Sequence, residues 1–103
     1  MHLTSLPGPY YNGDLGASAY KFVDLLSESA QSWWQMLPVH PIGAGYSPYS
    51  SCSSFAGETI FIDLEQLLKL GLLKKADLKK PKDSSAAKVK YAKSCKWRQE
   101  LLK

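Results

Sequence analysis

Residues 47–57 read Ser-Pro-Tyr-Ser-Ser-Cys-Ser-Ser-Phe-Ala-Gly, and the rest of the chain is organised around this stretch. Small polar residues dominate it, which is typical of a loop. The apolar residues 33–39 precede it, and an amphipathic segment, residues 63–70, follows it. A long polar loop after a buried strand is where a barrel enzyme carries its functional residues. The position of this stretch therefore indicates a functional loop.

The segments before this loop predict a helix followed by a strand. Residues 17–31 place apolar side chains at helical spacing, so we expect a helix there. Residues 33–39, Trp-Trp-Gln-Met-Leu-Pro-Val, are almost continuously apolar, as in a strand that is buried on both faces of a parallel sheet. A helix followed by such a strand is half of a βαβ unit and indicates an α/β fold. The expected core stripe of the helix is Ala19, Phe22, Val23, Leu26 and Ala30.

Three further elements are expected after the loop. Residues 59–62 predict a short strand, and Asp63 is expected to cap a helix that ends before Gly71. Residues 86–102 predict a last helix. One weak stripe of this last helix carries Tyr91, Cys95, Arg98 and Leu102.

Charge is distributed unevenly along the 103 residues, whose net charge is +4. Residues 1–68 hold one base against six acids, whereas residues 69–103 hold twelve bases against three acids. A basic C-terminal third is able to contact phosphate, although helix faces exposed to solvent are the interpretation that we favour. A small basic nucleic-acid-binding module, residues 69–103, is therefore the alternative function; it contains Tyr91 and Trp97 but no recognised nucleic-acid motif.

Several classes of protein are not supported by the sequence. No apolar run reaches the ~18 residues of a membrane span, and the start, Met-His-Leu-Thr, does not resemble a secretory signal. Cys52 and Cys95 lack metal or redox spacing, which favours a reduced, cytoplasmic chain with two free thiols. No metal-ligand cluster or Gly-rich phosphate loop is visible. We therefore expect no cofactor, no metal, no nucleic acid and no membrane as partners.

Four motifs, taken in order, resemble those of one enzyme family. They are residues 4–10 (Thr-Ser-Leu-Pro-Gly-Pro-Tyr) with 13–16 (Gly-Asp-Leu-Gly), residues 34–38 (Trp-Gln-Met-Leu-Pro), residues 47–49 with 53–57, and residues 62–73. Together they resemble the amylomaltases, the 4-alpha-glucanotransferases of glycoside hydrolase family 77. The second motif is similar to the family's second strand, and the third to the loop that follows it. The match is looser over residues 89–102, and Glu58-Thr59 stands where the family commonly has Asn-Pro.

The resemblance implies a (β/α)8 TIM-barrel enzyme that acts on maltooligosaccharides. A TIM barrel takes ~250 residues, so residues 1–103 would form a partial N-terminal portion of about two βα units, with no separate second domain. The family transfers α-1,4-glucan segments from a donor to an acceptor sugar with retention. Retention needs two carboxylates ~5 Å apart. In the family these lie downstream of the matched region, so we assign no catalytic residue and expect this chain alone to be inactive.

Tyr49 and Ser47 are the residues that we expect to bind substrate. The resemblance implies that the tyrosine of Ser-Pro-Tyr lies at the donor-side sugar, and a phenol offers a pyranose both an apolar face and a hydroxyl. Packing within the loop is the alternative for Tyr49, and capping of a turn is an equal alternative for Ser47. We interpret the other candidates as structural: Asp14 and Asp63 as caps, Glu58 as structural or neutral, His40 as structural, and Trp33 and Trp34 as core packing.

Overall fold

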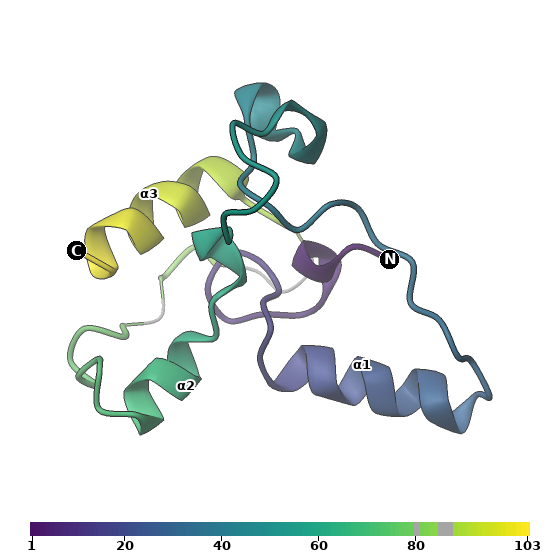
Figure 1. Cartoon of the computed structure of the whole chain (residues 1–103). Coiled ribbons are helices and arrows are strands. Elements are labelled where there is room, and N and C mark those ends of the chain that lie inside the picture. The colour runs from purple at the N-terminus through teal and green to yellow at the C-terminus, as the bar shows by residue number, and fades with distance from the viewer. Residues whose placement is uncertain (80, 85–87) are drawn as a thin grey trace.

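The computed structural model describes residues 1–79, 81–84 and 88–103. Within these ranges the regular elements are helices (Figure 1), with no strand beyond an isolated bridge at Lys88. The α-helices are α1 (Ala17–Glu28), α2 (Leu64–Lys69) and α3 (Tyr91–Leu101). The 3-10 helices are η1 (Leu3–Ser5), η2 (Ala44–Tyr46), η3 (Pro48–Ser50) and η4 (Thr59–Phe61).

The two predicted strands are absent from the described residues. Residues 33–39 form an unpaired stretch that returns from the end of α1 toward the N-terminus (Figure 1). A strand requires a neighbour to satisfy its backbone hydrogen bonds, and no described segment supplies one here. Residues 59–62 were also predicted wrongly, because the Glu58 side chain caps the 3-10 helix η4 instead. Two βα units are therefore not observed.

Helix α1 confirms the predicted helix but ends at Glu28, three residues before the predicted end at Gln31. Ala30 adopts a φ of 55°, so the chain leaves the helix there. The predicted stripe is only partly covered: Ala19 is buried, whereas Val23 is half exposed.

Helix α2 begins and ends at the predicted signals. The Asp63 carboxylate accepts the N–H groups of Glu65 (2.9 Å) and Gln66 (3.1 Å), which confirms the N-cap. Gly71 adopts a φ of 73° after the last turn, and the N–H of Leu72 donates to the carbonyl of Leu67 at 2.9 Å. This is the Schellman arrangement expected from a glycine at that position.

Helix α3 begins five residues later than predicted, at Tyr91; residues 86–87 of the prediction lie outside the described residues. The Lys90 N–H donates to the carbonyl of Tyr11 at 3.1 Å, which joins the start of this helix to the first loop, residues 6–16 between η1 and α1. The predicted stripe does face inward. Arg98 is wholly buried, and Tyr91 and Cys95 pack against the core.

The core lies between α1 and α3, around the first loop and η4 (Figure 1). Its buried members are Leu3, Leu6, Ala19, Ile60 and Phe61. The packing prediction is confirmed for Trp34 and wrong for Trp33. Trp34 meets Phe22 edge to face at 4.8 Å and donates its indole N–H to the Met1 carbonyl, whereas Trp33 is 90% exposed because nothing described covers it. Within the described residues, every helix is too short or too polar to cross a membrane.

Candidate functional site

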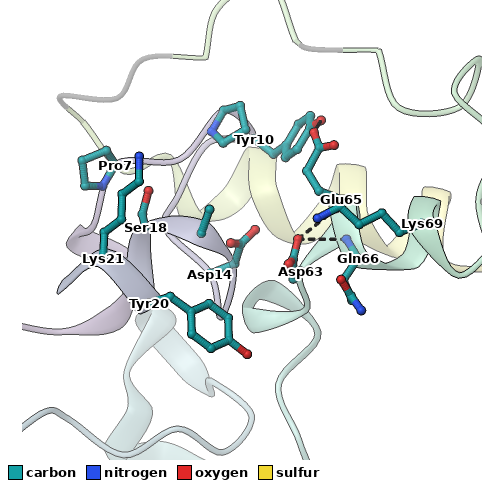
Figure 2. A pocket seen from close by; sticks show the side chains of 12 residues that line it. Pro7, Tyr10, Asp14, Ser18, Tyr20, Lys21, Asp63, Glu65, Gln66 and Lys69 are labelled. Carbon is teal, nitrogen blue, oxygen red and sulfur yellow. Dashed lines mark hydrogen bonds between the residues drawn. The ribbon is translucent and has the colours of Figure 1, made fainter. Parts of the chain in front are cut away.

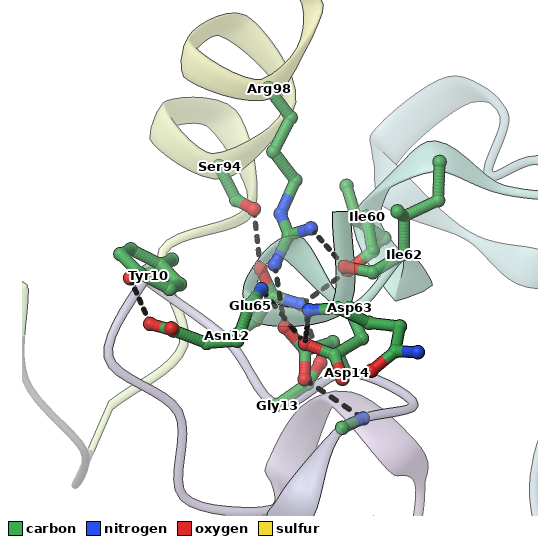
Figure 3. A network of polar contacts seen from close by, with 12 residues as sticks. Tyr10, Asn12, Gly13, Asp14, Ile60, Ile62, Asp63, Glu65, Ser94 and Arg98 are labelled. Atoms are coloured by element: carbon green, nitrogen blue, oxygen red, sulfur yellow. Dashed lines mark hydrogen bonds and ion pairs between the residues drawn. The ribbon is translucent and has the colours of Figure 1, made fainter. Parts of the chain in front are cut away.

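A buried ion pair anchors the first loop (Figure 3). The Arg98 guanidinium donates to the Asp14 carboxylate at 3.0 Å and to the Ile62 carbonyl at 2.6 Å. The other Asp14 oxygen accepts the N–H of Gly16 at 3.1 Å, at the start of α1. Burial raises the pKa of Asp14, and the adjacent guanidinium opposes this rise. Asp14 thus closes the turn that leads into α1, as the sequence predicted, but it does not cap the helix, and its pairing with Arg98 was not predicted.

Two further contacts extend this network. The Asn12 amide donates to the carbonyls of Gly13 (2.6 Å) and Ile60 (2.9 Å), and its oxygen accepts from the Ser94 hydroxyl. Tyr10 donates to the Glu65 carboxylate and stacks on Trp97 with ring centroids 5.4 Å apart. Burial and the hydrogen bond to Glu65 both raise the pKa of the Tyr10 phenol. The first loop is therefore fixed to both α2 and α3.

A cavity of about 510 Å³ lies between the first loop, α1 and α2 (Figure 2). Three of its lining residues are the acids Asp14, Asp63 and Glu65. Each carboxylate already has a structural role, because Asp14 pairs with Arg98, Asp63 caps α2 and Glu65 binds Tyr10. These contacts account for the three acids as structural groups, and we assign none of them a catalytic role.

The loop that carries Tyr49 is folded tightly onto itself. The Ser47 hydroxyl oxygen accepts the Tyr49 N–H at 3.2 Å, and Pro48 occupies the first position of η3. The Gly43 N–H donates to the Ser47 carbonyl at 2.9 Å. A Cβ on Gly43 would lie 1.8 Å from the Ser50 carbonyl oxygen, so only glycine fits there. The structure thus shows Ser47 in its capping role, with its sugar-binding role still a prediction.

Tyr49 is 74% exposed and borders a cavity of about 260 Å³. The other lining residues are Met1, His2, Gln35, Met36 and Leu37. The structure thus places the predicted tyrosine beside the apolar segment 33–39, as expected for a loop that follows it. The loop is also attached to α3, because Tyr46 stacks on Tyr91 with ring centroids 6.0 Å apart.

The remaining candidates have structural or peripheral positions. Glu58 accepts the N–H groups of Ile42 and Ile60, so its structural interpretation is confirmed. Cys52 is exposed, and burial raises the pKa of the Cys95 thiol. No group of three or more His, Cys, Asp and Glu side chains suited to a metal occurs in the described ranges.

Part of the basic C-terminal third forms ion pairs within the chain, at the surface for two lysines and in the interior for Arg98. Lys90 and Lys93 both pair with Asp83, which also accepts a hydrogen bond from the Tyr11 hydroxyl at 2.8 Å. Arg98 is buried in its pair with Asp14. These contacts explain several of the bases as structural groups, and the nucleic-acid hypothesis gains no support.

The described residues thus combine a hydrogen-bonded loop that exposes Tyr49 with the neighbouring apolar residues 33–39, which pair with no described strand. The family model for 4-alpha-glucanotransferases, glycoside hydrolase family 77, matches residues 1–103. The chain is 48% identical to the 4-alpha-glucanotransferases of Aquifex aeolicus (over 105 residues) and Streptococcus pneumoniae (over 103 residues). These matches cover 99% of this chain, and 21% and 20% of those proteins, respectively.

A solved structure agrees with these relatives. The amylomaltase from Streptococcus agalactiae in complex with acarbose is 40% identical and superposes with a TM-score of 0.90, over 99% of this chain and 21% of that chain. The chain therefore belongs to the 4-alpha-glucanotransferase family, which confirms the resemblance seen in its motifs. It spans about a fifth of the length of the curated relatives that it matches.

The buried network was missed by sequence reasoning. The sequence predicts one weak stripe that contains Arg98 but gives this residue no partner, and it gives no signal for Asn12 or Ser94. A buried stripe position occupied by arginine is the one signal that pointed to a paired acid.

Proposed function

We propose that this chain is part of a 4-alpha-glucanotransferase, which transfers α-1,4-glucan segments between maltooligosaccharides with retention. Family membership over residues 1–103 carries this proposal. The solved relative from Streptococcus agalactiae is a complex with acarbose, which supports an oligosaccharide ligand. Each acid at the 510 Å³ cavity is engaged in a structural contact, so the reacting carboxylates would come from elsewhere in the enzyme.

Tyr49 is proposed to contact the donor-side sugar. Its ring is open to solvent and borders the 260 Å³ cavity, while the Ser47 cap holds its backbone. An aromatic face packs against the C–H groups of a pyranose, and the phenol hydroxyl bonds its oxygens. The Ser47 oxygen accepts the Tyr49 N–H but keeps its own O–H, which can donate to the same sugar.

The complete domain is proposed to be a TIM barrel in which residues 33–39 pair as a strand. Residues 1–103 would be a partial N-terminal portion of that barrel, without a second domain. The exposure of Trp33, Leu37 and Val39 supports this proposal, because apolar side chains of this size are normally covered.

We propose a cytoplasmic location on the basis of the two free thiols, Cys52 and Cys95. Immunodetection in fractionated cells tests this, and recovery of the protein outside the cytoplasmic fraction would overturn it.

Replacing Tyr49 with alanine is expected to lower kcat/KM for maltotriose disproportionation about 10- to 100-fold, which corresponds to about 1.4–2.7 kcal/mol of lost sugar contact. Tyr49→Phe keeps the ring and should lose less. The assay measures glucose release by the protein purified from its native host at its natural length. Tyr20→Ala is the matched control, because Tyr20 is similarly exposed (70%) but lies on α1. Full activity of Tyr49→Ala would remove the assigned contact, and a wild-type protein without transfer would refute the proposed function.

A further inference from the structure

We propose that Glu58 is a positioning residue that closes the loop of residues 42–58 and thereby holds Tyr49 at the sugar site. This inference rests on the proposed role of Tyr49. Glu58 touches neither Tyr49 nor the 260 Å³ cavity that Tyr49 borders, so it acts through the loop backbone.

The Glu58 carboxylate joins the two ends of this loop. One oxygen accepts the N–H of Ile42 at 2.7 Å, sixteen residues earlier in the chain. The other accepts the N–H of Ile60 and the hydroxyl of Thr59, each at 3.2 Å. Hydrogen bonds to an ionised acceptor are roughly twice as strong as neutral ones, so this carboxylate is a strong closure for a surface loop.

A short series of contacts leads from Glu58 to Tyr49. Ile42, which Glu58 holds, is followed by Gly43, whose N–H donates to the Ser47 carbonyl and whose carbonyl accepts the N–H of Tyr46. The Ser47 side chain then caps the turn that carries Tyr49. Gly43 packs directly against the Ser50 backbone, so there is no free space between them. A shift of Ile42 would therefore also displace the turn that carries Tyr49.

The chemistry of the side chain makes the proposal specific to a carboxylate. Glutamine has only one acceptor oxygen. Its amide NH2 is a donor and would face the other of the two backbone N–H groups, which is also a donor. Glu58→Gln therefore keeps the size of the side chain but cannot satisfy Ile42 and Ile60 together. Glu28→Gln makes the same change of charge at an exposed position at the end of α1 and serves as the control.

The experiment combines hydrogen exchange with maltotriose affinity in the protein purified from its native host. Glu58→Gln is expected to speed exchange of the Ile42 and Ile60 amides about tenfold and to weaken maltotriose binding about 5- to 10-fold, while Glu28→Gln changes neither. In the Tyr49→Ala background, Glu58→Gln should produce no further loss of affinity, because the two residues act in series.

Four outcomes would overturn the proposal. Unchanged exchange at Ile42 in Glu58→Gln would show that the carboxylate does not close the loop. Faster exchange with unchanged affinity would show a closure without a positioning role, and additive losses in the double variant would show that Glu58 does not act through Tyr49. A wild-type protein that binds no maltotriose would refute the proposed function together with the positioning role. The exchange result would still show whether the Glu58 carboxylate closes the loop.

Discussion

Replacing Arg98 with methionine is expected to lower the free energy of unfolding by about 3–5 kcal/mol. Arg98 is wholly buried and holds both the Asp14 carboxylate and the Ile62 carbonyl. Methionine fills much of the same volume but leaves a buried charge and a buried acceptor without a donor. Urea unfolding of the native-length protein measures the loss.

Two further variants test the cause of this loss. Adding Asp14→Asn to Arg98→Met is expected to recover part of it, because the unpaired buried charge is then removed. Lys96→Met changes an exposed base on the same helix and should stay within about 0.5 kcal/mol of wild type. A cost below about 1 kcal/mol for Arg98→Met would show that the network does not hold the first loop in place.

The same substitution should become more harmful as the pH rises. Burial raises the pKa of Asp14 above its ordinary value of 3.8, so the folded state binds this proton more tightly than the unfolded state. Stability from this group is present below the unfolded pKa and is lost as the pH rises through the folded pKa. Without Arg98 the folded pKa rises further, so the loss in Arg98→Met should be larger at about pH 7 than at about pH 4. A loss independent of pH would show that Asp14 is not desolvated.

The second large effect concerns the polypeptide of residues 1–103 produced alone, which is expected to aggregate or to melt without cooperativity. Trp33 and Phe55 are almost fully exposed, and none of the described residues forms a strand beside residues 33–39. Exposed apolar surface and unpaired backbone of this kind favour association between chains. Circular dichroism on heating, with sedimentation analysis, provides the test. A sharp cooperative melt of a monomer would contradict the expectation.

Local signals in the sequence predicted local structure well. The apolar spacing of residues 17–31 located α1, Asp63 marked the start of α2, and Gly71 marked its end. Each of these features depends on residues within one or two turns of each other, so the pattern is complete in the sequence.

Features that depend on distant partners were not predictable. The apolar run of residues 33–39 predicts a buried strand. A strand also needs a partner strand, and no described residue supplies one. The alternation of apolar residues in residues 59–62 predicted a strand. This prediction was wrong, because the Glu58 side chain caps a 3-10 helix there.

The site shows the same division between local and distant signals. The motif Ser47-Pro48-Tyr49 located the exposed loop directly. In contrast, Arg98 and Asp14 are 84 residues apart, and Ser94 and Asn12 are 82 residues apart. Residues so far apart in the sequence form no local pattern that predicts their pairing. The network that fixes the first loop is therefore visible only in the folded structure.

The most direct test is a chimera in which residues 1–103 replace the matching segment of the Streptococcus agalactiae amylomaltase. The two backbones superpose with a TM-score of 0.90, so the chain should fit the rest of that amylomaltase without rearrangement. We expect the chimera to melt cooperatively and to release glucose from maltotriose, and we expect Tyr49→Ala to reduce that rate about 10- to 100-fold. A chimera that melts cooperatively but transfers no glucan would contradict the assignment of this chain as a working part of a 4-alpha-glucanotransferase.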